Sequence, residues 1–160
     1  QSIKKAIGKY NGSKRRFEFV GRLRTGAKVF DDYAHHPTEI KRTLSAVRKN
    51  NSKSKIICIF QPHTYSRTKA LFSDFVTSFY DADTVILMAI YPSLREEKDS
   101  TVSSELLAQK ISQTHRGVLF LPDESSVVEY IDQKKYDDNT IIITMGAGDV
   151  YKISEKLDFR

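Results

Sequence analysis

The chain has 160 residues, of which 39% are hydrophobic and 29% are charged. These values are typical of a single globular domain that can bury a core of its own. No apolar run reaches the roughly 20 residues that a membrane-spanning helix needs, and no secretory pattern opens the chain. We therefore expect a soluble globular domain with no membrane partner.

The net charge of +6 raises the question of a nucleic-acid partner. The basic residues are spread along the chain, for example at Lys4–Lys5, Lys14–Arg16, Arg22–Arg24 and Lys41–Arg42. No motif for reading a groove or a single strand accompanies them. Since an anionic small molecule accounts for the positive charge as well, we do not expect nucleic acid as a partner.

The single cysteine, Cys58, lies within the apolar run Ile56–Phe60. Because the sequence has no second cysteine, Cys58 cannot form an internal disulfide, which agrees with a reducing compartment. A cysteine in such a run is typically a buried, unreactive thiol rather than a nucleophile.

The first 30 residues predict the tail of a helix followed by a β-hairpin. Residues 1–12 end in a helix-stop signal, Asn11-Gly12, and we interpret them as the tail of a preceding domain or a linker. The alternating residues 16–23 and the run 27–30 flank Thr25-Gly26, a pattern typical of a hairpin at one end of a sheet.

From Pro37 onward, helical and extended patterns alternate, and Pro37 itself suits a first helical turn. The expected helices cover Pro37 to Val47, Leu71 to Phe79, Ser103 to Ile111, Asp123 to Ile131 and Gly146 to Leu157. The expected strands cover 55–60, 84–90, 117–121 and 140–144, and 95–100 is expected to be a mobile polar loop. Helices between strands require crossover connections, so the fold class is α/β, with a mainly parallel sheet covered on both faces.

Two polar turns lie where an apolar strand ends and a helix is expected to begin. The first is Asp31 to Glu39 (DDYAHHPTE), and the second is Gln61 to Thr68 (QPHTYSRT). Ligands bind at this edge of an open α/β sheet, because the strand ends open into a crevice and helix N-termini present unpaired N–H groups. The two turns therefore predict a binding site.

In the first turn, a carboxylate at the strand end can accept the hydroxyls of a ribose or join a cation site. It can equally cap the next helix or pair with an arginine, and we expect one of Asp31 and Asp32 to face a ligand and the other to be structural. His35 and His36 are adjacent and cannot both face one ion, so we expect no metal site here. One of them is expected to handle a proton or a hydrogen bond.

In the second turn, His63 and Arg67 lie four residues apart. If a helix begins near Tyr65, both side chains can converge on an anionic group beside its N-terminus, although a surface arginine and a loop histidine remain the alternative. The Gly146–Gly148 turn lacks the further glycine of a dinucleotide fingerprint, but it allows a ligand or a backbone to approach closely. No phosphate-binding P-loop and no nucleophile elbow occur, so we do not expect a complete phosphoryl-transfer centre.

These two turns, together with Gly12–Phe19 and Gly146–Asp149, resemble the C-terminal domain of the Mur ligases. The form Q-P-H-x-x-S-R-T favours the branch that joins L-alanine to UDP-N-acetylmuramate in peptidoglycan synthesis. The resemblance implies that residues 13–160 form a Rossmann-like domain of a three-domain cytoplasmic enzyme. It implies ATP, with Mg²⁺ held mostly by a central domain, and an acyl phosphate that the amine of L-alanine attacks. The N-terminal domain would hold the UDP-sugar, and the isolated domain is expected to be inactive.

The resemblance also implies residue roles. Arg16 and Asp32 match positions that hold the nucleotide, with Asp32 at the ribose. Four residues match positions around the incoming amino acid: Tyr33, His35, His63 and Arg67. Among these, Arg67 is the candidate for the carboxylate and His35 the candidate catalytic residue, while Thr64 stands where many relatives carry arginine. A peptide-adding Mur ligase domain and a separate nucleotide-binding module remain the alternatives.

Overall fold

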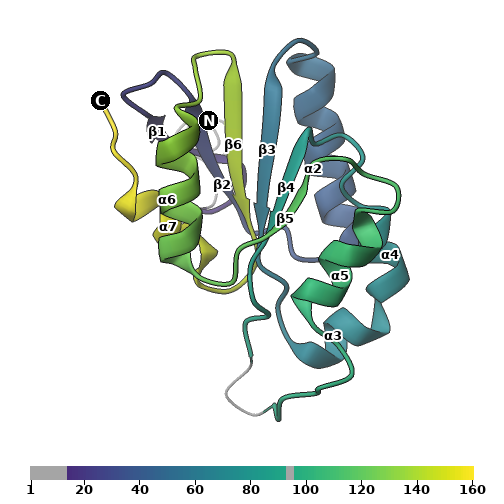
Figure 1. Ribbon diagram of the computed structural model, residues 1–160. Coiled ribbons are helices and arrows are strands. Elements are labelled where there is room, and N and C mark those ends of the chain that lie inside the picture. The colour runs from purple at the N-terminus through teal and green to yellow at the C-terminus, as the bar shows by residue number, and fades with distance from the viewer. Residues whose placement is uncertain (1–13, 93–95) are drawn as a thin grey trace, which may run out of the picture.

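The computed structural model describes residues 14–92 and 96–160, which form a six-stranded sheet (Figure 1). From one edge to the other, the strands are β1 (Glu18–Arg22), β2 (Lys28–Asp32), β6 (Thr140–Met145), β3 (Lys55–Phe60), β4 (Thr84–Leu87) and β5 (Val118–Phe120). The β1–β2 pair is antiparallel and the other neighbouring pairs are parallel. The predicted α/β fold, with an N-terminal hairpin at one end of the sheet, is confirmed.

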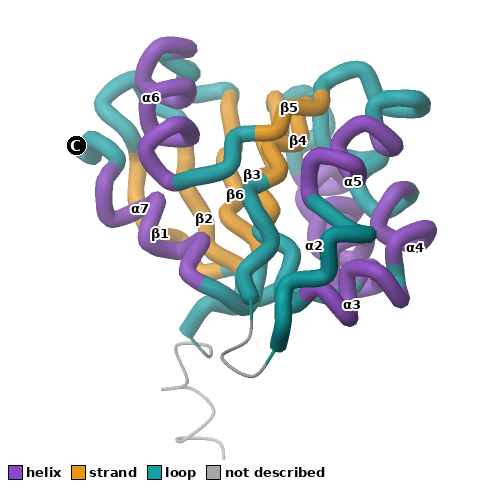
Figure 2. The backbone as a smooth tube through the Cα atoms, turned by 60° about the horizontal axis from the view of Figure 1, so that its bottom comes forward, coloured by secondary structure: helices purple, strands orange, loops and turns teal. Residues whose placement is uncertain are grey.

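Helices cover both faces of the sheet (Figures 1 and 2). One face is covered by α2 (Pro37–Asn50), α4 (Phe72–Val76) and α5 (Ser104–Ile111), and the other by α6 (Glu124–Lys134) and α7 (Lys152–Lys156). In β3, Ile56, Cys58 and Phe60 belong to the first core layer, whereas Ile57 and Ile59 belong to the second. This alternation is that of a strand buried on both faces. Burial raises the pKa of the Cys58 thiol, in agreement with an unreactive cysteine.

The starts of three helices show how local sequence sets the elements. Pro37 occupies the first turn of α2, and Ser103 and Asp123 cap α5 and α6, as the sequence predicts. The cap of α2 is His36, whose Nδ1 accepts from the Thr38 N–H at 3.3 Å. Of the two structural alternatives for Asp31 and Asp32, capping of this helix is not observed, whereas pairing with an arginine is, between Asp31 and Arg15.

The expected helix from Leu71 to Phe79 is wrong in its extent. The structure has two short helices, α3 (Tyr65–Ala70) and α4, which meet at Leu71. The rings of Phe75 and Phe79 nevertheless pack 5.5 and 5.4 Å from the ring of Phe60. The apolar spacing therefore identifies the side of the chain that faces the core, and it does not require a continuous helix.

Smaller differences concern the element ends. The strand expected to reach residue 90 ends at Leu87, where its neighbour β5 also ends at Phe120. The last helix is a short 3-10 turn, η1 (Asp149–Tyr151), followed by α7. The helix tail predicted over residues 1–12 lies outside the described residues. No helix in the described part of the chain is long and apolar enough to cross a membrane.

The order of the strands creates a switch point, and with it a crevice, at the carboxyl ends of β2, β6 and β3. After β2 and β3, the chain turns toward the α2 face, whereas after β6 it turns toward the α7 face. In Figure 2 the carboxyl ends of these strands come forward between the two groups of helices. Ligands of open α/β sheets bind at such a switch point, and both predicted polar turns lie there.

Candidate functional site

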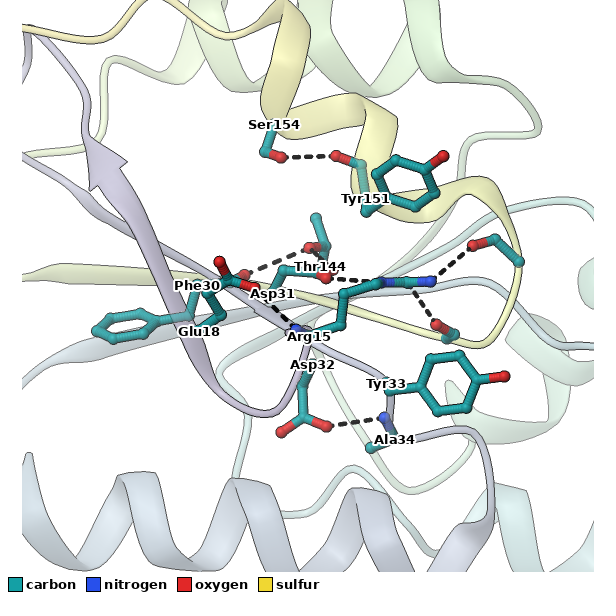
Figure 3. A network of polar contacts seen from close by, with 12 residues as sticks. Arg15, Glu18, Phe30, Asp31, Asp32, Tyr33, Ala34, Thr144, Tyr151 and Ser154 are labelled. Carbon is teal, nitrogen blue, oxygen red and sulfur yellow. Dashed lines mark hydrogen bonds and ion pairs between the residues drawn. The ribbon is translucent and has the colours of Figure 1, made fainter. Parts of the chain in front are cut away.

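Asp31 is a structural residue. Its Oδ1 accepts from the Thr144 hydroxyl at 2.7 Å, and its Oδ2 accepts from Arg15 Nε at 2.8 Å (Figure 3). The Asp31 side chain is 5% exposed. Because both oxygens are bound to partners within the chain, Asp31 corresponds to the structural member of the predicted pair.

Asp32 is bound less completely and lines an open hollow. Its carboxylate accepts from the Ala34 N–H at 2.8 Å and from the Thr43 hydroxyl at 3.3 Å. Burial raises the pKa of Asp32 above its ordinary value, although these hydrogen bonds oppose the rise. Further hydrogen-bond donors, such as the hydroxyls of a ligand, would stabilise the charged form of this carboxylate.

The hollow has a volume of about 400 Å³. It is lined by Arg16, Phe17, Asp32, Tyr33, Ala34, His35, Glu39, Arg42 and Thr43. Four residues that the sequence singled out thus lie around one space. The hollow combines two carboxylates, aromatic rings and cations, a set that can hold the parts of a nucleotide.

His35 has its ring orientation set by its own turn. Its Nδ1 lies 3.0 Å from the carbonyl oxygen of Tyr33 and 3.5 Å from Glu39 Oε2. Because a carbonyl oxygen only accepts, Nδ1 carries a proton, and in the neutral form of the ring Nε2 is the acceptor. Nε2 is therefore the His35 atom that can accept a proton or a hydrogen bond from a ligand.

His63 lies at the start of the second turn, with its ring stacked on Tyr91 at 5.6 Å. Its Nδ1 is buried and has no hydrogen-bond partner. Burial lowers the pKa of His63, and the positive charge of Arg67 and the protonated form of His35 lower it further. Charged groups from both turns therefore act on His63, and they favour the neutral form of its ring beside the Arg67 guanidinium.

The N-terminus of α3 is occupied by a carboxylate from the protein itself. Glu96 Oε2 accepts from the Tyr65 N–H and Glu96 Oε1 from the Ser66 N–H, both at 2.7 Å. The anion expected beside this helix start is thus supplied by Glu96, within the segment predicted to be a mobile loop. The Arg67 side chain forms no hydrogen bond or ion pair with any described residue.

The glycines in the turn after β6 allow neighbouring segments to lie close to its backbone. Gly146 has a φ of +147°, and a Cβ there would lie 2.7 Å from the carbonyl oxygen of Gln61. A Cβ on Gly148 would lie 2.7 Å from both Gln61 Oε1 and Tyr91 Cγ. The two glycines therefore let the chain after β6 pack against the chain after β3.

Several residues near the carboxyl ends of the strands are not identified from the sequence. Arg15, Tyr91 and Glu96 reach their partners from distant segments, and Arg42 lines the hollow from the second turn of α2. Only the polarity of the segments around them could have drawn attention to them. No group of three or more His, Cys, Asp or Glu side chains that could hold a metal ion occurs among residues 14–92 and 96–160.

Comparison with known families supplies the decisive observation. Residues 15–148 match the family described as "Mur ligase, glutamate ligase domain". The chain belongs to the Mur ligase family. The turns from which the sequence predicted a site thus lie inside the matched Mur ligase region, as do all six predicted site residues.

Relatives with known names resemble this Mur ligase domain over nearly its whole length. It is 47% identical over 155 residues to the UDP-N-acetylmuramate–L-alanine ligase of Acetivibrio thermocellus, covering 97% of this chain and 32% of that protein. It is 44% identical to the ligase of the same name from Clostridium tetani, covering 97% of this chain and 33% of that protein. The chain therefore spans about a third of the length of the curated relatives it matches.

Solved structures show the same fold. The UDP-N-acetylmuramate–alanine ligase of Thermotoga maritima matches with a TM-score of 0.73 and 23% identity, over 97% of this chain and 34% of that chain. A murein peptide ligase from Psychrobacter arcticus matches with a TM-score of 0.74 and 20% identity, over 98% of this chain and 32% of that chain. Both alanine and peptide ligases share this Mur ligase fold, so the fold alone does not select the substrate.

Proposed function

We propose that residues 13–160 are the C-terminal domain of an ATP-dependent ligase that joins L-alanine to UDP-N-acetylmuramate, and that residues 1–12 are the tail of the preceding domain or a linker. The observation that carries this proposal is the 44–47% identity, over 97% of the chain, with ligases of that name. In this reaction ATP phosphorylates the sugar's carboxylate, and the alanine amine then attacks the acyl phosphate. ADP, phosphate and the amide are the products.

The hollow supports a nucleotide role for Asp32 and Arg16. The Asp32 carboxylate accepts from Ala34 and Thr43, with the Phe17 backbone as a further contributor, and a ribose hydroxyl can donate to the acceptor capacity that remains. Arg16 is exposed at the rim of the same hollow and makes no hydrogen bond with a described residue, so its charge is available for phosphate.

The second turn supports a role in amino-acid binding. Arg67, whose guanidinium pairs with no residue in the described part of the chain, can bind the carboxylate of L-alanine beside the His63 ring. Tyr33 and His35 extend this region toward the hollow. Nε2 of His35 can accept the proton that the attacking amine loses, which makes His35 the proposed catalytic residue.

The other components of the reaction belong to the rest of the proposed enzyme. Among residues 14–92 and 96–160, no group of three or more His, Cys, Asp or Glu side chains fits Mg²⁺, so we assign the metal to the central domain with the ATP phosphates. The N-terminal domain would hold the UDP-sugar. The proposed enzyme is cytoplasmic and uses neither nucleic acid nor a membrane as a partner.

The test is a chimeric ligase in which residues 13–160 replace the corresponding third of the Acetivibrio thermocellus relative. Phosphate release is measured with ATP, Mg²⁺ and UDP-N-acetylmuramate, with and without L-alanine. We expect release that depends on L-alanine. Release that requires a peptide instead would place the domain in the peptide-adding branch. Tight ATP binding by the isolated chain, with an inactive but folded chimera, would favour a separate nucleotide-binding module.

The Arg67→Ala variant of the chimera tests the amino-acid site. We expect the KM for L-alanine to rise by the equivalent of about 2–4 kcal/mol, because a charge-assisted contact to a carboxylate is lost. Lys69→Ala is the matched control, since Lys69 lies on the same short helix but pairs with Asp99 in solvent. An unchanged KM for L-alanine in the Arg67 variant would contradict the assigned role.

A further inference from the structure

Arg15 and Arg16 are adjacent in the sequence but have different environments. The Arg15 side chain is 22% exposed and fully engaged by the protein, as Figure 3 shows. Arg16 is exposed and lines the hollow. The sequence assigned a role only to Arg16, and the resemblance to the family gave Arg15 none.

The guanidinium of Arg15 joins two loops at the crevice. Its Nε donates to Asp31 at the end of β2, at 2.8 Å. Its two terminal nitrogens donate to the carbonyl oxygens of Gly146 at 2.7 Å and Gly148 at 3.3 Å, in the turn after β6. A planar fork with donors in fixed directions is suited to hold such partners in one relative position.

Two aromatic rings enclose the same cation. The guanidinium carbon of Arg15 lies 5.2 Å from the ring centre of Tyr33 and 4.7 Å from that of Tyr151. Tyr33 follows β2, whereas Tyr151 belongs to η1 after β6. The cation therefore contacts a ring from each of the two loops that its hydrogen bonds already join.

The backbone of Arg15 completes the arrangement. Its carbonyl oxygen accepts from the Tyr33 N–H at 2.6 Å, and its N–H donates to Glu18 Oε2 at 2.8 Å. Arg15 has a φ of +60°, which is uncommon for a residue other than glycine. Surrounding contacts must hold such a conformation, and here the fork, the rings and the Tyr33 amide all do so.

We propose that Arg15 is a positioning residue that holds the turn after β2 and the glycine turn after β6 in place before any nucleotide binds. Arg15 thereby sets the place of Asp32 and Tyr33 at the hollow, while Arg16 is the cation left to contact the ligand. The part of this inference that concerns the nucleotide rests on the proposed function. The positioning role itself concerns the free chain.

Amide hydrogen exchange of the chain without nucleotide tests the positioning role. Two reporters are the Tyr33 N–H, bound to the Arg15 carbonyl, and the Gly146 N–H, bound to the Asp32 carbonyl at 3.2 Å. In Arg15→Gln we expect both to exchange roughly tenfold faster or more, with a smaller increase in Arg15→Lys, because lysine keeps the charge but loses the fork. Amides of β3 serve as the control for global folding.

Arg16→Gln is the matched variant, and it should leave exchange at Tyr33 and Gly146 unchanged. If Arg15→Gln fails to fold, Tyr151→Leu replaces it, since that change removes one ring and leaves the fork; faster exchange at Gly146 is again expected. Unchanged exchange in Arg15→Gln, or in Tyr151→Leu when it must stand in, would overturn the positioning role.

The chimeric ligase separates this inference from the proposed function. We expect both Arg15→Gln and Arg16→Gln to raise the KM for ATP, but only Arg15→Gln to loosen the turns. Faster exchange in Arg15→Gln, combined with an ATP KM that neither variant changes, would contradict the nucleotide role of the hollow and support positioning. A raised KM in both variants without faster exchange in Arg15→Gln would overturn positioning and support the nucleotide role.

Discussion

At the scale of single residues, two adjacent carboxylates have different environments. Asp31 forms an ion pair with Arg15 and is bound by Thr144, whereas Asp32 has hydrogen-bond donors but no ion-pair partner among the described residues. A buried carboxylate without a cationic partner reduces stability, because burial disfavours its charged form. This cost to stability agrees with the binding role proposed for Asp32.

Asp32→Asn should stabilise the chain at neutral pH. The folded-state pKa of Asp32 is raised, so its contribution to stability is complete below about pH 4 and is lost as pH rises through the folded pKa. Asparagine keeps an acceptor for the Ala34 N–H and removes the buried charge. Thermal unfolding should give a Tm above that of the wild type at pH 7, with a smaller difference near pH 4.

Asp31→Asn is the control for that experiment, because it removes the carboxylate that neutralises Arg15. We expect this variant to be less stable than the wild type at pH 7. A lower Tm for Asp32→Asn at pH 7 would show that its hydrogen bonds outweigh the burial of its charge.

His63 should make stability depend on pH in the mildly acidic range. Its folded-state pKa is lowered below 6.5, so stability is fully present above about pH 6.5 and is lost as pH falls toward the folded pKa. Urea unfolding from pH 5 to 7.5 should show this loss, and His63→Gln should reduce it. An equal slope in the variant would mean that His63 does not titrate with folding.

At the scale of elements, helix starts at the crevice are capped by side chains of the protein. His36 and Glu39 cap α2 reciprocally, while Glu96 caps α3 from 30 residues away. These caps bind N–H groups that would otherwise attract an anionic ligand. In the proposed function, ligand binding at this edge therefore depends on side chains such as Arg16 and Arg67 rather than on free helix ends.

Replacing the cap of α2 tests this view. His36→Ala should lower the free energy of unfolding by about 0.5–2 kcal/mol, since the Thr38 N–H loses its acceptor. His36→Asn should restore most of that loss, because asparagine is a favoured cap. Urea unfolding of both variants provides the measurement, and equal losses in the two would show that capping is not the function of His36.

At the scale of the whole molecule, the centre of the sheet is more firmly enclosed than its hairpin edge. The β3 and β6 strands pair on both sides, and β6 is buried at all six positions. By contrast, β1 pairs on one side only and exposes Phe19 and Val20. The structure thus combines a stable central sheet with a less protected edge next to the segment that carries Arg15 and Arg16.

Native-state hydrogen exchange should reproduce this gradient. We expect the amides of β3 and β6 to exchange only by global unfolding, and those of β1 to exchange by local opening with a lower free energy. Denaturant dependence of the exchange rates distinguishes the two processes. Equal protection of β1 and β3 would mean that the hairpin unfolds together with the core.

Much of the fold is predictable from the sequence because its signals are local. The apolar run of β3, Pro37 at the start of α2, and the caps Ser103 and Asp123 each depend on residues a few positions apart. The same holds for the two polar turns, since each follows a strand directly. The break at Leu71 is the exception, because the apolar spacing continues through it.

The sequence by itself determined the α/β class and placed the candidate site, with its residue types, at the strand ends. Only the tertiary structure decided which side chains are engaged: Asp31 by Arg15, the start of α3 by Glu96, and the glycine turn by Tyr91. The physical reason is distance along the chain. Period and capping act over one helical turn, whereas these partners lie from 16 to over 50 residues apart and meet only when the sheet forms.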